Sequence, residues 1–484
     1  MGRGINFPQT AVAVMLGGVV ERAHIIYCVW LIASVVLFAC LSPRTALLVV
    51  YWAGWGLLPT AAFPLPDTVK PLALDLMASL PGEFFLTKAT VLGISALTGV
   101  LLFDLRRVLA WRPTWWDAPL GVWCTVPLAS AFASDAGWQV GALGTAYLAL
   151  AWGTPYVLGR IYFGDAGGRR ALAVAIILAG LLYVPLCLVE GVMGPGIATL
   201  VFGYHPYQYA GAQRYIGYRP VGFLEDGNQL GMWTAGAALV AFWLWREGAL
   251  PKWRRVPAGA VVTVLVAAAV AGQSVGSVLL AVAGAATLEV TRRVKSRALA
   301  GVLLVMVVGF LVIRATNVLP LGPLAKNSHF GQLVARELSA SGRGSAGWRL
   351  KMEEQHIATA LERPILGWGQ WDWWRGGEGR PWGLWLLVFG MYGFVGLASV
   401  YALVLLSSIR AMRALPLTQW RTNAAAIALG SLLVMTALDS LLNSGVILPV
   451  LLAAGGLGTE RPIGKSSALP KIGNPASVQS PSTL

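Results

Sequence analysis

Long stretches of continuously apolar residues alternate along this chain with short polar connections. The stretches are about 17–25 residues long, the length at which a helix crosses a hydrocarbon core of roughly 30 Å. Their hydrophobicity does not alternate from residue to residue, as it would in the strands of a membrane barrel. Because lipid offers the backbone no hydrogen-bond partners, each stretch is expected to pair its own peptide groups as a helix. The pattern predicts an all-α fold, a polytopic membrane bundle of about 12–13 transmembrane helices.

The predicted spans fill residues 24–458, which we interpret as one transmembrane domain. Residues 1–23 contain an apolar segment too short to cross a membrane comfortably, and we interpret it as an interfacial N-terminal segment. Residues 459–484 are rich in Lys, Ser, Pro and Gly, which predicts a disordered cytoplasmic tail. The predicted spans lie near residues 24–41, 46–63, 85–103, 118–134, 141–159, 171–192, 228–245, 256–272, 274–290, 298–315, 382–408, 421–440 and 443–458.

Composition and charge agree with a membrane protein and indicate its orientation. Of all residues 57% are hydrophobic and only 12% are charged, which is too little charge to cover a soluble surface. The net charge of +15 does not indicate nucleic acid binding, because Lys and Arg gather in alternate short connections. By the positive-inside rule these connections are cytoplasmic. The longer loops 193–227 and 316–381 are then expected on the outer side of the membrane.

Few polar or reactive side chains lie within the predicted spans. Glu190 and Asp439 are exceptions, and each is expected either to face a polar cavity or to mark the end of a helix. The cysteines are expected to behave as small apolar residues, and no metal-ligand spacing is present. The sequence therefore predicts no metal and no other cofactor. The four cysteines are Cys28, Cys40, Cys124 and Cys187.

The first long loop ends in a polar run at residues 213–229, directly before a predicted span. Arg214 and Arg219 lie in this run, and a guanidinium group is a planar fork that suits phosphate oxygens. The structural alternative for both arginines is an anchor in the lipid headgroups. Asp226 or Asn228 can be explained equally well as the N-cap of the following helix.

The second long loop contains a predicted helix at about residues 345–362. Arg349, Glu353 and His356 recur on it at three- or four-residue steps and therefore share one face. The structural alternative for Arg349 and Glu353 is an exposed i, i+4 ion pair worth only about 0.3–0.5 kcal/mol. Pro364 ends the helix, and the chain is expected to turn sharply there.

The rest of the second loop is basic and aromatic, including Trp371, Trp373, Trp374 and Arg380. Its excess of Lys and Arg over Asp and Glu favours an anionic ligand. The tryptophans can stack on the C–H faces of sugar rings, although a belt at the membrane interface explains them as well.

Two of these segments resemble the O-antigen ligase family, which includes O-antigen polymerases. The run Arg219-Pro220-Val221-Gly222-Phe223, followed by Asn228, is similar to an Arg-x-x-Gly-Phe element of the family. Arg349 stands fifteen residues before Pro364-Ile365-Leu366-Gly367-Trp368-Gly369, which is similar to the Pro-x-x-Gly-x-Gly turn of the family.

The predicted span after the second loop extends the resemblance and also departs from it. Gly393 and Gly396 resemble a pair of glycines three residues apart in the family. The histidine expected eleven residues before them is Trp382 here. A Ser-Arg-Gly element of the family becomes Ser274-Val275-Gly276, which lacks the arginine.

The resemblance implies transfer or polymerisation of a glycan from an undecaprenyl-diphosphate carrier to a lipid or glycan acceptor, in the biosynthesis of cell-surface polysaccharide. No metal is implied. Arg219 and Arg349 are expected to stabilise the departing diphosphate, because fixed cations favour a transition state that gathers negative charge. The candidates for accepting the acceptor's proton are Glu225, which we prefer, then Asp226, Glu353 and His356. The expected substrate-binding residues are Arg214, Asn228, His356, Arg380 and Trp382.

Two other readings remain open. A bundle with basic outer loops also suits a transporter that flips a glycolipid, although the chain has no internal repeat. A relative without activity, binding lipid-linked glycan or polysaccharide assembly proteins, is favoured by the histidine that Trp382 replaces.

Overall fold

In the computed structural model, the described residues are 9–60, 78–82, 84–202, 213–214, 216–252, 256–318, 332, 344–375 and 379–458. Helices are the regular structure among them, apart from one isolated bridge between Gln213 and Tyr218. The predicted all-α fold is confirmed. The predicted tail at 459–484 and much of the second loop lie outside the described residues.

The helices follow one another in two groups. The first group is α1 (Gln9–Cys40), α2 (Pro43–Leu48), η1 (Val49–Ala53), α3 (Gly54–Leu57), α4 (Lys88–Phe103), α5 (Leu105–Ala110), η2 (Trp115–Asp117), α6 (Ala118–Ala133), α7 (Trp138–Leu148), η3 (Ala149–Gly153), α8 (Thr154–Tyr162), α9 (Ala166–Met193) and α10 (Ile197–Phe202). The second group is α11 (Gly227–Arg246), α12 (Ala258–Ala271), α13 (Val275–Val294), α14 (Ala298–Thr316), α17 (Gly344–Leu361), α18 (Leu384–Ala414), η4 (Leu417–Gln419), α19 (Ala424–Asp439), η5 (Leu448–Val450) and α20 (Leu451–Leu457).

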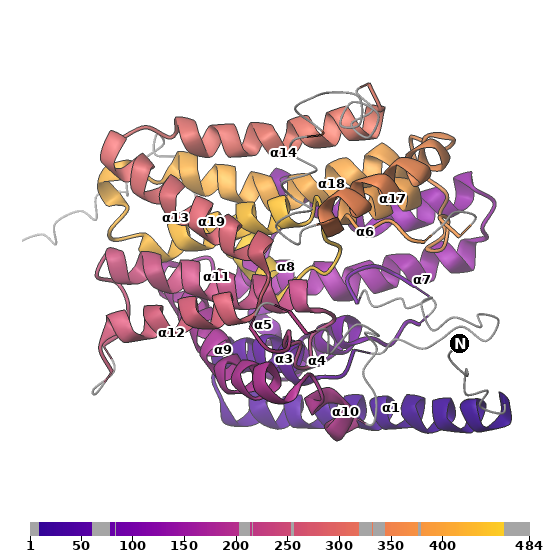
Figure 1. Cartoon of the computed structure of the whole chain (residues 1–484), viewed down its shortest axis with the longest axis horizontal. Helices are drawn as coiled ribbons and strands as arrows, with labels where there is room; N and C mark the ends of the chain where they lie inside the picture. The colour runs from indigo at the N-terminus through magenta and orange to yellow at the C-terminus, as the bar shows by residue number, and fades with distance from the viewer. Residues whose placement is uncertain are drawn as a thin grey trace, which may run out of the picture.

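Among the described residues, five helices are long and apolar enough to cross a membrane, so the chain is a membrane protein. They are the Arg22–Cys40 part of α1, and α9, α13, α14 and α18. Helices α1, α14 and α18 run along the same direction of the bundle (Figure 1). Helix α1 continues without a break from Gln9, through residues that the sequence assigned to an interfacial segment.

Several predicted spans are not single helices. The predicted span at 46–63 includes parts of α2, the π-helical turn η1 and α3, and the one at 141–159 includes parts of α7, the π-helical turn η3 and α8. The predicted span at 443–458 begins with non-helical backbone and contains only η5 and the short helix α20. Polar residues and a glycine at 443–445 explain the late start of α20, because they disfavour a helix there.

Helix α20 is held in place by close packing of glycines against α8. A Cβ atom on Gly455 would lie 2.0 Å from the carbonyl oxygen of Tyr156, and one on Gly159 would lie 2.4 Å from that of Leu452. The two backbones can approach this closely only without side chains, as small residues allow in membrane helices. The contact fixes the end of the chain segment that begins at residue 440.

The turn at Pro364–Gly369 fits into a break in α18. Gly393 leaves the helical conformation there, with a φ of 62°. The N–H of Phe394 donates to the carbonyl of Pro364 over 2.7 Å, and the N–H of Gly369 donates to the carbonyl of Met391 over 2.9 Å. The turn thus pairs peptide groups that the break would otherwise expose, and it fixes α17 against α18.

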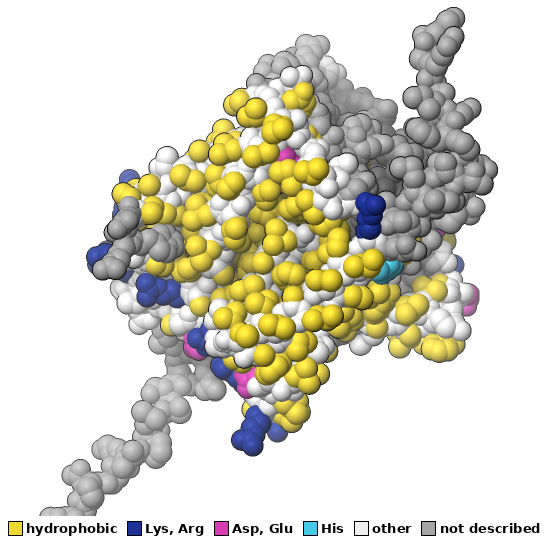
Figure 2. All heavy atoms as spheres, turned by 90° about the horizontal axis from the view of Figure 1, so that it is seen from below, with side chains coloured by type: hydrophobic (Ala, Val, Ile, Leu, Met, Phe, Trp, Pro, Cys, Tyr) yellow, Lys and Arg dark blue, Asp and Glu magenta, His cyan; other side chains and the backbone are white. Residues whose placement is uncertain are grey.

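The bundle has two polar ends. Helix α11 has 20 residues, which separates its ends by about 30 Å. One end, here called the basic end, carries Arg160, Arg246, Arg292 and Arg410. The other, here called the site end, carries α17, which lies across α18 at the right of Figure 1. Apolar side chains cover the face between them, and Lys and Arg gather toward its left edge (Figure 2).

Candidate functional site

The polar side chains of the site end converge on residues 440–447, the central segment, which links α19 to η5. The first residue of α18, Leu384, also donates its N–H to the carbonyls of Ser440 and Asn443. The central segment therefore joins parts of the chain that are far apart in sequence. Side chains that hydrogen-bond to it include those of Ser79, Gln229, Arg349, Arg380, Tyr401 and Asp439.

Arg349 is bound to the central segment and not to its neighbour on α17. Its Nη1 donates to the Oδ1 of Asn443 over 2.5 Å and to the carbonyl of Leu442 over 3.2 Å. Asn443 in turn donates to Asp439 over 2.8 Å. Asp439 is close enough to Asp226 and Arg349 for their charges to act on it. These contacts bring α17 next to the start of α11.

Arg380 and Trp382 lie beside Arg349. The guanidinium carbon of Arg349 is 5.3 Å from the centroid of the Trp382 ring, and that of Arg380 is 5.0 Å from it. Arg380 also donates to the hydroxyl of Ser444 over 3.2 Å. Both distances suit cation–π attraction, so the ring helps to hold two cations close together.

Arg219 is nearly buried, 5% exposed, at the start of α11. Its Nη2 donates to the Oδ1 of Asn228 over 2.7 Å. A Cβ atom on Gly227 would lie 2.2 Å from the Nε of Arg219, so the guanidinium group occupies the space that this glycine leaves. Asp226 accepts the backbone N–H of Asn228 and of Gln229 and is the N-cap. Of the two capping candidates, Asp226 therefore caps the helix, and Asn228 binds Arg219.

Glu190 holds the loop that carries Arg219. The side chain of Glu190 is fully buried, and its Oε2 accepts the N–H groups of Val221 and Gly222 over 2.8 and 2.7 Å. Its Oε1 accepts the N–H of Ile197 over 3.2 Å. The carboxylate of Glu190, near the end of α9, thus accepts hydrogen bonds from three backbone N–H groups and fixes the position of the loop that carries Arg219.

Glu225 and Lys88 are both buried and close enough for their charges to attract each other. The carboxyl of Glu225 is 2% exposed and accepts the N–H of Ala78 over 3.1 Å. Lys88, the first residue of α4, is fully buried, with its ammonium group 4.7 Å from the centroid of the Trp55 ring. Burial raises the pKa of the Glu225 carboxyl, although attraction to Lys88 opposes the rise. A carboxyl with a raised pKa is a stronger proton acceptor once it is ionised.

Glu353 pairs with Arg314 of α14. The alternative interpretation from the sequence, an exposed ion pair between Glu353 and Arg349, is therefore wrong. Glu353 and the guanidinium of Arg314 are both inaccessible to solvent and are 3.3 Å apart, from Oε2 to Nη2. Arg314 also contacts Glu354 over 2.5 Å. The pair attaches α17 to α14.

The Glu353 pair predicts a pH-dependent stability. Burial raises the pKa of Glu353 from 4.5 to about 7, more than attraction to Arg314 lowers it. The folded protein then binds this proton more tightly than the unfolded chain, so the stabilisation is complete below about pH 4.5 and is lost as the pH rises toward 7. The unfolding free energy of the wild type minus that of Glu353→Gln should fall by on the order of 2 kcal/mol over this window. Thermal unfolding of both proteins between pH 4.5 and 8 measures it, and a difference independent of pH contradicts the assignment.

Two predicted substrate-binding residues lie apart from this cluster of contacts. His356 is 2% exposed, its ring centroid is 6.1 Å from that of Trp373, and burial lowers its pKa. Arg214 belongs to the turn closed by the bridge of Gln213 with Tyr218, and its side chain is exposed. The structure therefore brings together Arg349, Arg380 and Trp382, and it places Arg219, Asn228 and Glu225 at the adjoining start of α11.

The sequence did not single out Lys88, Arg314 or Asn443. A signal for the first two was present, because a charged residue within a predicted apolar span is costly and needs a partner. Asn443 had no such signal, since the segment around it was predicted to be an ordinary helix.

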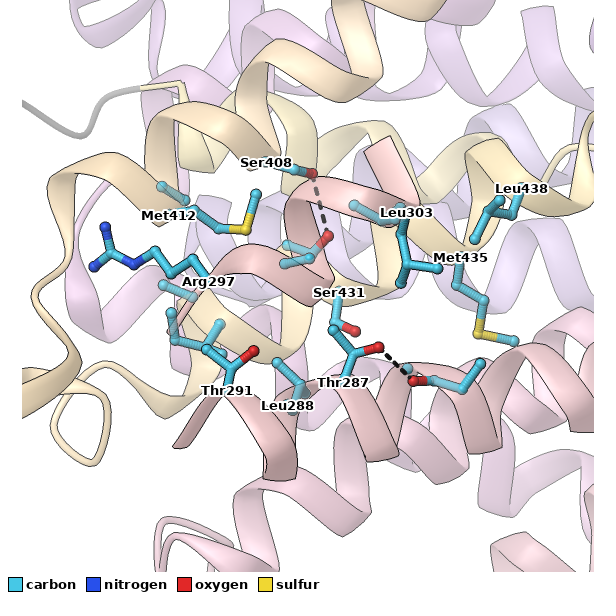
Figure 3. A pocket seen from close by; sticks show the side chains of 18 of the residues that line it. Thr287, Leu288, Thr291, Arg297, Leu303, Ser408, Met412, Ser431, Met435 and Leu438 are labelled. Carbon is cyan, nitrogen blue, oxygen red and sulfur yellow. Dashed lines mark hydrogen bonds between the residues drawn. The ribbon is translucent and has the colours of Figure 1, made fainter. Parts of the chain in front are cut away.

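A cavity of about 50 Å³ lies between α13, α14, α18 and α19 (Figure 3). Its lining is mostly apolar, and the hydroxyls of Thr287 and Ser408 donate to the carbonyls of Ala283 and Gly430. This cavity therefore offers few groups that could bind a polar substrate or take part in a reaction.

Within the described residues, no group of three or more His, Cys, Asp or Glu side chains is placed to hold a metal ion. No protein-family model matches the chain, and no curated protein matches it.

Proposed function

We propose that this protein is an integral membrane glycosyltransferase of O-antigen ligase or polymerase type. It transfers or polymerises a glycan from an undecaprenyl-diphosphate carrier at the outer face of the bacterial inner membrane. The observation that carries the proposal is the convergence of α17, the start of α18 and the start of α11 on the central segment. Guanidinium groups and a buried carboxyl thus lie in one region of the site end, which is what a reaction with a diphosphate leaving group requires.

In the proposed reaction, the bond between the sugar carbon and the diphosphate oxygen breaks, and a bond from that carbon to the acceptor oxygen forms. Undecaprenyl diphosphate leaves with the bonding electrons, and its negative charge grows as it departs. Arg219 and Arg349 stabilise that charge more in the transition state than in the ground state. Glu225 accepts the proton of the acceptor hydroxyl, and Arg380 binds the anionic donor.

The arrangement of the arginines supports these roles. Arg349 donates to two neutral groups, the side chain of Asn443 and the carbonyl of Leu442. Its charge is therefore not cancelled by a direct ion pair among the described residues. Arg219 donates to the amide oxygen of Asn228, which holds the guanidinium group at the start of α11. Arg314, in contrast, has two glutamate partners. The charge of Arg349 therefore suits a diphosphate better than that of Arg314 does.

The proposal is tested with protein purified in detergent and supplied with undecaprenyl-diphosphate glycan and an acceptor. The wild type should release the lipid carrier, and Arg349→Ala should reduce the rate by about 100-fold or more, the loss expected when one charge-stabilising donor is removed. Arg246→Ala, at the basic end, is the matched control and should keep the wild-type rate. No release by the wild type, or equal rates for the two variants, rejects the enzyme.

The same experiment separates the other readings. Tight binding of the glycolipid without release indicates a component without activity that holds lipid-linked glycan for partner proteins. Movement of the intact glycolipid between the leaflets of a vesicle indicates a transporter. In either case Arg349→Ala should weaken binding while no new glycosidic bond forms.

A further inference from the structure

A long apolar groove runs along α9 on the outside of the bundle. Its volume is about 880 Å³, and α2, η1 and α3 form the opposite wall. Leu178 and Leu182 in its lining are 45% and 71% exposed, so the groove is open toward the surrounding lipid. The α9 residues that line it recur at three- or four-residue steps between Gly167 and Leu186 and so form one face of the helix.

The two ends of the groove differ in chemistry. At the site end Tyr183, Phe223 and Trp233 close it, and the Tyr183 hydroxyl donates to the carbonyl of Gly56. At the basic end the groove begins at Arg170, which is the charged residue in its lining. Arg219 is not part of the lining. A ligand with an anionic head and an apolar chain therefore fits with its head at Arg170.

Arg170 differs from the arginines near it. Arg44 pairs with Asp165 over 2.6 Å, and Arg169 donates to the carbonyl of Gly164 over 2.6 Å. Arg170 is exposed and makes no hydrogen bond or ion pair with the part of the chain that the structure describes. With three arginines and one aspartate around the start of α9, the mouth of the groove carries a net positive charge.

We propose that this groove binds an anionic phospholipid from the membrane, with the phosphate on Arg170 and an acyl chain along α9. A guanidinium group forms paired hydrogen bonds with phosphate oxygens, which suits the exposed, unpaired side chain of Arg170. The acyl chain covers leucines that would otherwise contact mobile lipid. The site is separate from the proposed reaction, because its charged end lies at the basic end of the bundle.

The proposal is tested by native mass spectrometry of the purified full chain with phosphatidylglycerol and phosphatidylcholine in equal amounts. The wild type should retain phosphatidylglycerol preferentially. Arg170→Gln should weaken this binding roughly fivefold, the change expected for one arginine at a membrane surface. Ala175→Phe, which fills the groove with a ring, should weaken retention of the lipid even with Arg170 present.

Arg106→Gln is the matched control, since Arg106 is an exposed arginine of α5 that does not line the groove. It should bind phosphatidylglycerol as the wild type does. Equal losses for Arg170→Gln and Arg106→Gln overturn the proposal, as does equal retention of the two lipids. Retention of a polyprenyl phosphate that Ala175→Phe abolishes and Arg170→Gln leaves unchanged also overturns it, and assigns the groove to the carrier chain instead.

Discussion

An Arg314→Met variant is expected to lose about 3–5 kcal/mol of unfolding free energy, as when one partner of a buried ion pair is removed. Arg314 is 1% exposed and contacts both Glu353 and Glu354. Without the guanidinium group, the carboxyl of Glu353, which is inaccessible to solvent, loses the cation that offsets its loss of water. Thermal unfolding of the purified variant in detergent at pH 8, where Glu353 is mostly ionised, measures the loss.

Two further variants decide whether burial causes this effect. Arg246→Met removes a partner of Glu289 at a surface where the arginine side chain is 37% exposed, and should cost no more than about 1 kcal/mol. The double variant Arg314→Met/Glu353→Gln should recover part of the stability, because it removes one stranded carboxylate. Equal losses for Arg314→Met and Arg246→Met would show that the pair does not fix α17 to α14.

The helical fold could be predicted because the length of an apolar stretch is a local property of the sequence. Helices α9, α13, α14 and α18 follow directly from that length. The breaks could not be predicted in the same way. The non-helical start at residues 443–447 is stable because distant side chains, such as Gln229 and Arg349, satisfy its peptide groups and polar side chains. Hydropathy does not record such contacts.

The sequence predicted a turn at Pro364–Gly369, but it did not show which part of the structure this turn contacts. Pro364 was expected to end a helix, and it does so after Leu361. That the turn would enter α18 at Gly393 depends on packing between segments about 30 residues apart. The turn at Pro364–Gly369 and the break at Gly393 are therefore explained by one contact between them, which sets the position of α17.

The sequence showed which polar residues lie near the apolar spans, but it did not show which residues they contact. Arg219 and Asn228 stand out in the sequence because they precede an apolar span, and the structure joins them directly. The helical spacing suggested that Arg349 and Glu353 pair with each other. In the structure Arg349 binds Asn443, and Glu353 pairs with Arg314. Tertiary contacts prevailed because a local surface pair is worth only about 0.3–0.5 kcal/mol.

A Gly227→Ala variant should lose glycan transfer on the order of 100-fold while it stays as stable as the wild type. The new Cβ atom would lie 2.2 Å from the Nε of Arg219, so the guanidinium group has to move. A displacement of about 1 Å in a positioned group can cost a rate factor near 100. Stability should not fall, because Gly227 is the first residue of α11 and alanine favours a helix.

Gly276→Ala is the control, since a Cβ atom at that position on α13 meets nothing within 4 Å. Carrier release by the two variants, measured together with their thermal unfolding, separates misplacement of Arg219 from damage to the fold. If Gly227→Ala releases the carrier as fast as Gly276→Ala, then Arg219 does not stabilise the departing diphosphate. If Gly227→Ala instead unfolds early, Arg219 holds the start of α11 and its role is structural.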